Sequence, residues 1–207
     1  MQETEAMIRE CGRSYETLLI DLSNIAELPA RWREITDRFQ IDILVNNAGI
    51  ICREPAIQHS LEHWQAVIDT NLSSLFILSQ QLAKPMLERK SGKIINIASL
   101  LSFQGGIHVP GYTAAKHAVA GLTKALANEW ASSGVQVNAI APGYIETNNT
   151  EALRKDKERS ASILSRIPAG RWGSPKDLAG EVVYLASPAS NYVNGHVLVV
   201  DGGWMGR

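Results

Sequence analysis

Short runs of β-branched and apolar residues alternate along the chain with longer segments in which apolar residues recur every three or four positions. The short runs are typical of buried strands, and the longer segments are typical of amphipathic helices. Because largely apolar strands belong to parallel sheets with helices on both faces, the alternation predicts an α/β fold, a Rossmann-like doubly wound parallel sheet. We expect its strands at Tyr15–Leu22, Ile41–Val45, Lys93–Ala98, Val135–Ala141 and His196–Val200.

Several of the intervening helices carry recognisable end signals. A short N-terminal helix should close at Gly12, and Ser60 can cap the helix that follows the second predicted strand. Asn24 followed by Glu27 resembles a capping box, and Pro85 should kink or end its helix. Further helical segments are expected around Thr150–Arg166 and after Ser174-Pro175. The core-facing stripes are Leu28, Trp32, Ile35 and Phe39, then Trp64, Ile68, Leu72, Leu75 and Leu82, then Ala115, Val119, Leu122 and Leu126.

Composition narrows the class of protein. The 207 residues, 45% hydrophobic and 20% charged, fit a single domain spanning residues 1–207. A net charge of −1 without a basic block argues against nucleic acid or a membrane surface as partner. Cys11 and Cys52 are two lone cysteines, which suits a reducing, cytoplasmic location. Metal-ligand spacing is lacking among the histidines considered, His59, His63 and His117. We therefore expect a cytoplasmic protein without a metal site.

The chemistry is concentrated between Ser99 and Lys116. Ser99 follows a predicted strand, and Tyr112 and Lys116 lie four residues apart, on one face of the first turns of a helix. A phenol titrates near pH ~10, but an ammonium within ~4–6 Å favours the phenolate and lowers that pKa. Such a tyrosine can exchange a proton with an alcohol or carbonyl oxygen that Ser99 also binds. Alone, a Tyr-x-x-x-Lys pair is better explained by an exposed tyrosine beside a solvated lysine.

Other segments make this pattern specific. Together, Asn46-Asn47-Ala48-Gly49, Asn71, Ser99, Tyr112-x-x-x-Lys116 and Pro142-Gly143 resemble the classical short-chain dehydrogenases/reductases, from about Asp21 to the C-terminus. The resemblance implies a nicotinamide cofactor, NAD with NADP left open, and a small-molecule substrate. It also implies a homo-oligomer, usually a homotetramer, built through the two long central helices and the C-terminal strand.

The resemblance also assigns roles to residues. Tyr112 is the acid/base, Lys116 lowers its pKa, Ser99 positions the substrate oxygen, and Asn71 bends its helix and holds a water that links Lys116 to solvent. A buried asparagine bound to local backbone is the alternative for Asn71. The resemblance also implies contacts with the cofactor. Asp21 and Leu22 would lie at the adenine, and Asn47, Ala48 and Gly49 along the adenine-side ribose. Pro142, Gly143, Ile145 and Thr147 would lie at the nicotinamide, and Tyr112 and Lys116 would also contact the cofactor. A plain turn is the alternative for Asp21 and for Asn47–Gly49.

The substrate implied is a keto or hydroxy deoxy sugar acid; a 3-oxoacyl thioester, another gluconate or a catalytically defective, truncated subunit are the alternatives. Loop residues near Ser99 and Pro142 are candidates to bind it: Gln104, His108, Tyr144, Asn148 and Arg154. For the arginines outside the motifs, Arg53, Arg154, Arg159, Arg166 and Arg171, a solvated surface position is the favoured interpretation. Trp172 and Trp204 are expected to be packing or interface residues.

The glycine-rich turn of dinucleotide-binding folds is not found before Asn46, where Gly12 is the single glycine. We therefore expect an N-terminally truncated sheet that lacks one strand–helix–strand unit of roughly 30 residues. The predicted strand at Tyr15–Leu22 could move over to pair with Ile41–Val45. A structure without that pairing rejects this hypothesis.

Overall fold

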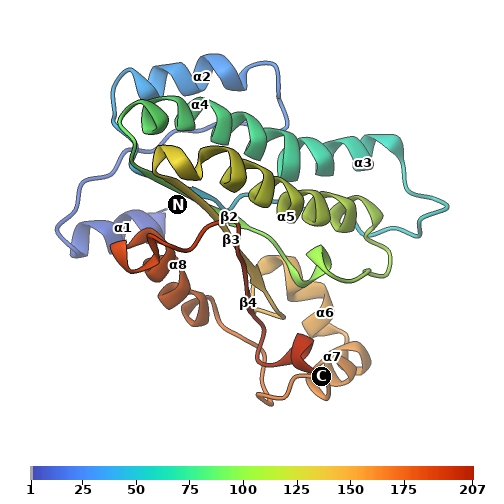
Figure 1. Cartoon of the computed structure of the whole chain (residues 1–207). Helices are drawn as coiled ribbons and strands as arrows, with labels where there is room; N and C mark the ends of the chain where they lie inside the picture. Colours follow the sequence, from blue (N-terminus) through green and yellow to red (C-terminus); the bar gives the residue numbers. More distant parts are fainter. Residues whose placement is uncertain (1) are drawn as a thin grey trace.

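The computed structural model describes residues 2–207, with side chains from residue 4 onward. Four parallel strands form a sheet in the order β1-β2-β3-β4, as in Figure 1. The sheet is built from β1 (Ile43–Asn46), β2 (Gly92–Ile97), β3 (Val135–Pro142) and β4 (Val197–Val200). The strand order follows the chain order, so successive strands pair through crossovers that contain helices.

Helices cover both faces of this sheet, which confirms the predicted doubly wound α/β fold. Ile94 of β2 packs into a cluster with residues of α2 (Leu28–Thr36), α4 (Ser74–Glu88) and α5 (Pro110–Trp130). The next residue, Ile95, packs with Ile140 and with Leu185 of α8 (Ala179–Ala186) on the other face. Neighbouring strand residues point to opposite faces, so a continuous apolar run supplies both layers.

Five further elements complete the fold. The N-terminal helix α1 (Gln2–Glu10) is followed by Gly12 at φ +66°, and α3 (Leu61–Ile68) is capped by the hydroxyl of Ser60, which accepts the His63 N–H at 3.1 Å. Both end signals are therefore confirmed. A π-helical turn, Asp69–Ser73, joins α3 to α4. The helices α6 (Glu151–Lys155) and α7 (Lys157–Leu164) follow β3 and lie beyond its carboxyl end (Figure 1).

The predicted strand at Tyr15–Leu22 is wrong. This segment forms neither a helix nor a strand, and within residues 2–207 the ladder partner of β1 is β2 alone. The proposed pairing with Ile41–Val45 is therefore rejected, and Ile43 and Val45 are 44% and 42% exposed at the outer edge. The physical reason is that Ile20 and Leu22 pack against the cluster around α2 and α4, which holds the segment away from the strand edge.

The capping residue of α2 and two core positions, Phe39 and Trp64, were predicted wrongly. Glu27, not Asn24, is the N-cap of α2 and makes no side-chain capping bond, and the helix begins with Pro29 in its first turn, where a missing N–H costs nothing. Phe39 lies beyond the end of α2 and is exposed. Pro85 lies within α4, which ends three residues later at Glu88. Trp64, expected in the core, is 37% exposed.

Candidate active site

Ser99 and Tyr112 meet at the carboxyl end of the sheet. Ser99 follows β2 and is the N-cap of a short turn, where its Oγ accepts the Leu101 N–H at 3.2 Å. Tyr112 lies in the first turn of α5, close enough to Ser99 for the serine side chain to act on the pKa of the tyrosine. The Ser102 hydroxyl donates to the Lys116 carbonyl at 2.6 Å, which fastens this turn to α5. The serine and the tyrosine therefore face one another, as their spacing predicts.

Lys116 lies beside them and is 4% exposed. Its Nζ donates to the Ile97 carbonyl at the end of β2 (2.5 Å) and lies 5.5 Å from the centroid of the Tyr112 ring. Burial lowers the pKa of Lys116 to about 8, because a charged amine is poorly solvated there. A lysine held in this way is not the solvated surface residue of the alternative interpretation.

The expected effect of Lys116 on Tyr112 is not what the structure shows. Burial raises the pKa of Tyr112, while the hydrogen bond from Ser99 and the positive charge of Arg53 act in the opposite direction. Lys116 is directed at the Ile97 carbonyl, and it is Arg53 that supplies the cation acting on the phenol. Lys116 is not among the groups that act on this pKa here, so its effect on Tyr112 stays a prediction, and the raised pKa keeps the phenol protonated at neutral pH.

Asn71 occupies the π-helical turn between α3 and α4 and is 1% exposed. Its Oδ1 accepts the Ile50 N–H and its Nδ2 donates to the Ile50 carbonyl, both at 2.8 Å. A side chain on Gly49 would lie 3.2 Å from Asn71 Oδ1, so a glycine permits this close approach. Asn71 therefore binds backbone, as in the alternative considered above, but backbone 21 residues away, in the loop that leaves β1.

The loop after β3 is held from two sides. The Gly143 N–H donates to the Val200 carbonyl at 2.9 Å, and Ile145 forms a parallel bridge with Gly173 through the Glu146 and Gly173 N–H groups. Within residues 2–207 the Ile145 N–H donates to no group, while its carbonyl accepts the Thr150 hydroxyl at 2.6 Å. The loop thus presents the unpaired N–H of Ile145 beside the buried side chain of the same residue.

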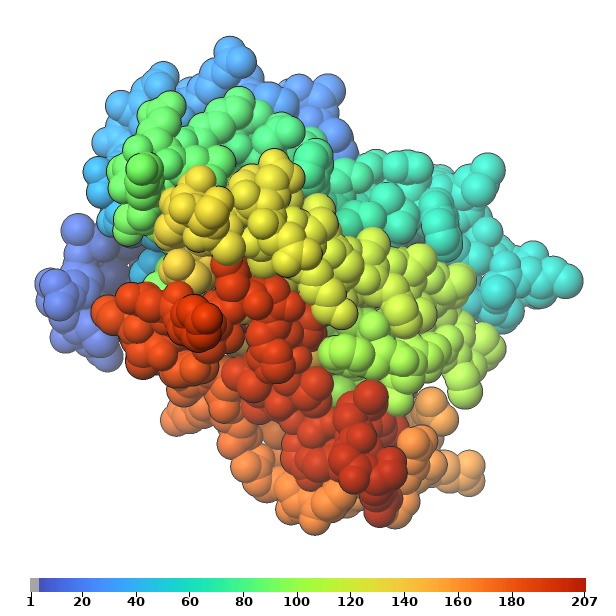
Figure 2. All heavy atoms as spheres, in the orientation of Figure 1, coloured from blue at the N-terminus to red at the C-terminus, as the bar shows by residue number. Residues whose placement is uncertain are grey.

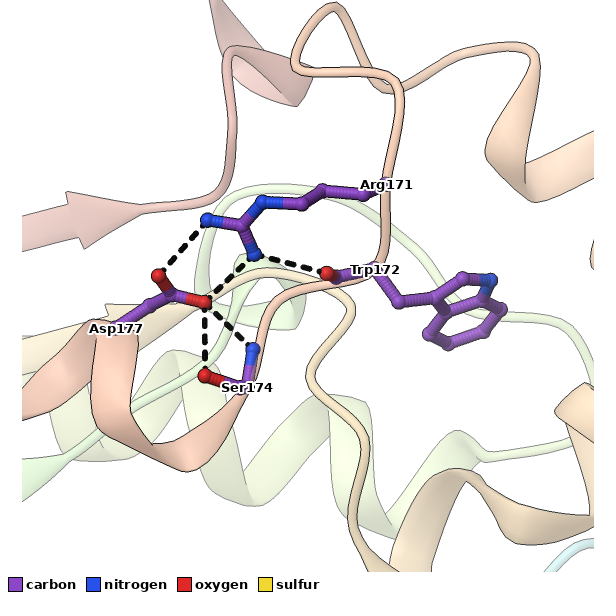
Figure 3. A network of polar contacts seen from close by, with 4 residues as sticks. All are labelled: Arg171, Trp172, Ser174 and Asp177. Carbon is purple, nitrogen blue, oxygen red and sulfur yellow. Dashed lines mark hydrogen bonds and ion pairs between the residues drawn. The ribbon is translucent and has the colours of Figure 1, made fainter.

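An ion pair holds the Gly173 side of that bridge (Figure 3). Arg171 donates to both carboxylate oxygens of Asp177 at 2.8 Å, and Asp177 also accepts the Ser174 N–H at 2.7 Å. Arg171 and these hydrogen bonds hold the pKa of Asp177 well below its usual range. Arg171 is exposed, as predicted, and it also fastens the turn that supports the Ile145 loop.

The candidate substrate residues lie around the same loop but have different surroundings. Tyr144 packs against Trp172 and Trp204, with ring centroids 5.5 and 4.6 Å away, so both tryptophans are packing residues as expected. Gln104 accepts the Trp204 indole N–H at 3.4 Å, and Arg154 donates to the Thr147 carbonyl at 3.2 Å. His108 and Asn148 are exposed, and His108 has a φ of +62°.

Known proteins resemble this chain over almost its whole length. A family model described as enoyl-(acyl carrier protein) reductase, within the short-chain dehydrogenases/reductases, matches residues 1–205. The 2-dehydro-3-deoxy-D-gluconate 5-dehydrogenase of Bacillus subtilis is 58% identical over 207 residues, which is 100% of this chain and 82% of the relative.

The chain belongs to the short-chain dehydrogenase/reductase family.

Two solved structures of the family agree with this membership. One, a candidate NAD(P)-dependent gluconate 5-dehydrogenase from Beutenbergia cavernae with bound NADP, is 50% identical, has a TM-score of 0.96 and matches 99% of this chain and 82% of its own. The other, a gluconate 5-dehydrogenase from Burkholderia cenocepacia in complex with NADP and tartrate, is 39% identical, has a TM-score of 0.94 and matches 99% of this chain and 81% of its own.

The residues present fit the nicotinamide end of the family's dinucleotide. The unpaired Ile145 N–H is a free donor, and the exposed Thr147 lies two residues further along the same loop. At the other end, a cleft of about 310 Å³ beside β1 is lined by Leu22, Asn46, Asn47 and Ala48 among others. Asp21, predicted at the adenine, uses Oδ1 to accept both the N–H and the hydroxyl of Ser23 (2.9 and 2.7 Å), which is the plain turn of the alternative interpretation.

The roles of two residues were not predicted from the sequence. Asn46 lies in a buried polar chain, donating to Ser79 and to Asn96, which in turn donates to Thr123 of α5, so it ties β1 and β2 to the helices. Arg53 is exposed, as predicted, and also lies close enough to Tyr112 to act on its pKa. Its position four residues after Gly49, in a loop that leaves a strand's carboxyl end, is the signal that could have identified it.

No group of three or more His, Cys, Asp or Glu side chains able to hold a metal was found in the described part of the chain. The helices of residues 2–207 include none with the length and apolar character needed to cross a bilayer. Cys11 and Cys52 are both free cysteines.

Proposed function

We propose that this chain is an NAD(P)-dependent oxidoreductase that transfers a hydride between a nicotinamide cofactor and a keto or hydroxy group of a deoxy sugar acid of the 2-dehydro-3-deoxy-D-gluconate type. One observation carries the proposal: Ser99 at the end of β2 and Tyr112 in the first turn of α5 lie close enough for Ser99 to act on the pKa of the tyrosine, beside a buried Lys116. Identity of 58% to a relative named for that activity supports the substrate class.

In the reduction, the bound nicotinamide supplies a hydride to the carbonyl carbon. Tyr112 gives its hydroxyl proton to the carbonyl oxygen, so that a ketone, a hydride and a proton become a secondary alcohol. The raised pKa of Tyr112 suits this donor role, because the phenol is protonated before the step. Ser99 binds the same oxygen and lies beside Tyr112, on whose pKa it acts.

Lys116 and Asn71 act through the residues that touch the substrate. We propose that Lys116 places a buried positive charge 5.5 Å from the ring, where it stabilises the tyrosinate that remains after proton transfer. Asn71 fixes the loop after β1 through Ile50 and supports the proton relay from Lys116. Both are positioning residues.

For the cofactor we propose that Asn47, Ala48 and Gly49 lie along the adenine-side ribose. The nicotinamide is held by the loop after β3, through Pro142, Gly143, Ile145 and Thr147, and Ile145 donates to it through its free N–H. Leu22 contributes to the cleft beside β1, and Asp21 reaches the adenine with the carboxylate oxygen not used by Ser23. Tyr112 and Lys116 complete the set. The chain acts as one domain, residues 1–207, and its free cysteines suit the cytoplasm.

A second copy of the chain is the partner we propose for the groove between α4 and α5. Leu72, Phe76, Ala118 and Leu122 line this groove, and Phe76 is 40% exposed there, so the groove presents apolar side chains that a second copy would cover. The resulting homo-oligomer agrees with the assembly that the family resemblance implies.

The test is a two-part assay of the purified chain. Nicotinamide fluorescence is followed during titration with NADH and NADPH, and turnover is measured with 2-dehydro-3-deoxy-D-gluconate, 5-keto-D-gluconate and a 3-oxoacyl thioester. We expect cofactor binding and the highest kcat/KM with the deoxy sugar acid. Preference for the thioester would contradict the substrate class, and binding without turnover on any substrate would contradict the enzyme assignment.

A further inference from the structure

One buried hydroxyl joins the turn that begins at Ser99 to the helix that carries Lys116. Ser102 ends the short turn Leu100–Ser102 and is 7% exposed. Its Oγ accepts the Ser99 N–H at 3.3 Å and donates to the Lys116 carbonyl at 2.6 Å. Figure 2 shows the light-green segment that follows β2 lying against the yellow-green start of α5, and the turn and the helix are in contact. A single side chain therefore connects the backbones of two residues of the candidate active site.

Neither the turn nor the helix needs this hydroxyl for its own hydrogen bonds. Backbone bonds already close the turn, because the Ser102 N–H donates to the Ser99 carbonyl and the Phe103 N–H donates to the Leu100 carbonyl, both at 2.9 Å. Lys116 lies inside α5, where a carbonyl ordinarily accepts the N–H four residues later. The Ser102 hydroxyl is thus an additional donor to the Lys116 carbonyl, and its effect is to hold the turn on α5.

The group that depends on this link is the Ser99 hydroxyl. Ser99 Oγ accepts the Leu101 N–H of the same turn at 3.2 Å, which leaves its own O–H free to donate to a substrate oxygen. On the helix side, the Lys116 side chain is bound to the Ile97 carbonyl at the end of β2. The side chain of Lys116 therefore fixes α5 to the strand, and Ser102 fixes the turn to α5. The place of the Ser99 hydroxyl relative to α5 follows from these two links.

We propose that Ser102 is a positioning residue that holds the Ser99 hydroxyl in place opposite Tyr112, so that both hydroxyls reach the same carbonyl oxygen. The proposal rests on the oxidoreductase function above and deepens it. Tyr112 lies one helical turn before Lys116, so the carbonyl that Ser102 binds belongs to the same rigid helix as the proton donor. Ser102 is itself buried and acts through Ser99. A shift of about 1 Å in a catalytic group can lower a rate by about 10²-fold.

The test compares Ser102→Ala with Ser190→Ala, a matched control away from the candidate site. Ser190 is 0% exposed, and its hydroxyl likewise donates to a helix carbonyl, that of Leu185 at 2.9 Å, and accepts from a nitrogen, Lys93 Nζ at 3.0 Å. We expect Ser102→Ala to lower kcat for 2-dehydro-3-deoxy-D-gluconate by about 10- to 100-fold, with KM and NADPH affinity within about threefold of the wild type. Ser190→Ala should keep the wild-type kcat. Wild-type kcat in Ser102→Ala, or an equal loss in both variants, overturns the proposal.

A double-mutant cycle separates positioning from general destabilisation. In a Ser99→Ala protein the hydroxyl that Ser102 positions is absent, so adding Ser102→Ala should change the rate by less than about twofold. The rates are measured in single turnover with enzyme in excess, which keeps the slow variants measurable. If the two losses multiply instead, Ser102 acts independently of Ser99, and the proposal is overturned.

A third measurement does not depend on turnover. Amide hydrogen exchange at Ser99 and Leu101 is followed by NMR in the wild type, in Ser102→Cys and in Ser190→Ala; a thiol fills nearly the same space as the hydroxyl but is a weak donor. We expect exchange at Ser99 to be at least about tenfold faster in Ser102→Cys and unchanged in Ser190→Ala. Unchanged exchange in Ser102→Cys overturns the proposal. A wild type inactive on every ketone would refute the oxidoreductase function and with it the catalytic role of Ser102, whereas a wild type that turns over beside an equally active Ser102→Ala refutes the positioning role alone.

Discussion

Gly143 lies where β3 gives way to the loop that we propose holds the nicotinamide, and replacing it with alanine should damage activity more than stability. A Cβ at this position would lie 2.6 Å from the Cα and 2.8 Å from the Cβ of Asp201. Ordinary contact begins at 3.4 Å, so one backbone segment must withdraw from the other by 3.4 − 2.6 = 0.8 Å. Because the obstacle is backbone at the end of β4, a side-chain rotation cannot relieve it.

The expected cost follows from this displacement. Overpacking of this kind destabilises a protein by about 1–3 kcal/mol. The Gly143 N–H bond to the Val200 carbonyl would lengthen, and Ile145 and Thr147 would move with the loop. Since a misplacement of about 1 Å in a catalytic group can cost about 10²-fold in rate, we expect kcat/KM of Gly143→Ala to fall by about that factor.

Gly180→Ala is the matched control, because a Cβ at Gly180 meets nothing within 4 Å and the residue lies inside α8. It should leave kcat/KM unchanged and stabilise the protein by about 0.5–1 kcal/mol. The assays are steady-state turnover with NADPH and urea unfolding of the wild type and both variants. A Gly143→Ala protein with wild-type kcat/KM would refute the reasoning, since the loop would then tolerate the shift that the geometry demands.

Three further predictions come from other parts of the structure. Lys116→Met should be more stable than the wild type at neutral pH, because folding lowers the pKa of Lys116 from 10.5 to about 8. Between these pH values the unfolded state binds more protons than the folded state, so the wild type should regain up to about 3 kcal/mol of stability as the pH rises from 8 to 10.5. Urea unfolding at pH 7 and pH 10 measures the difference in stability between the two proteins, and a difference that does not change with pH contradicts the prediction. Asp177→Asn should weaken cofactor binding in the fluorescence titration. Because the pKa of Asp177 is depressed in the folded protein, the wild type should be more stable than the variant above pH ~4 and should lose this advantage as the pH falls through the folded pKa. A wild-type advantage in stability that persists at low pH argues against the ion pair. Phe76→Asp, tested by light scattering on a gel-filtration column, should reduce a multimer to the 22.6 kDa monomer, and an unchanged mass places the interface elsewhere.

Much of the fold follows from local patterns that the structure preserves. The strands β1 to β4 were predicted to within two residues at each end, because apolar β-branched runs can be buried on both faces only between helices. Tyr15–Leu22 has the same local character but lacks a neighbouring ladder, so tertiary context decides its conformation. A strand needs a partner that the sequence of the segment itself does not reveal.

The candidate site divides in the same way. The positions of Ser99, Tyr112 and Lys116 could be predicted because strand-end and helix spacing place them together. The direction of the Tyr112 pKa could not, since it depends on burial and on Arg53, which is 59 residues away in the sequence. Long-range contacts of this kind also explain why Asn71 binds Ile50 and why Arg171 supports the Ile145 loop through Asp177.

The most direct test of the central claim is the activity of Tyr112→Phe, measured alongside its affinity for NADPH. The variant keeps the ring beside Lys116 and removes only the hydroxyl that Ser99 binds. If Tyr112 is the proton donor, turnover should fall by about 10²- to 10⁴-fold while the NADPH titration is unchanged. Wild-type turnover in a correctly folded Tyr112→Phe protein would contradict the proposed role of this tyrosine.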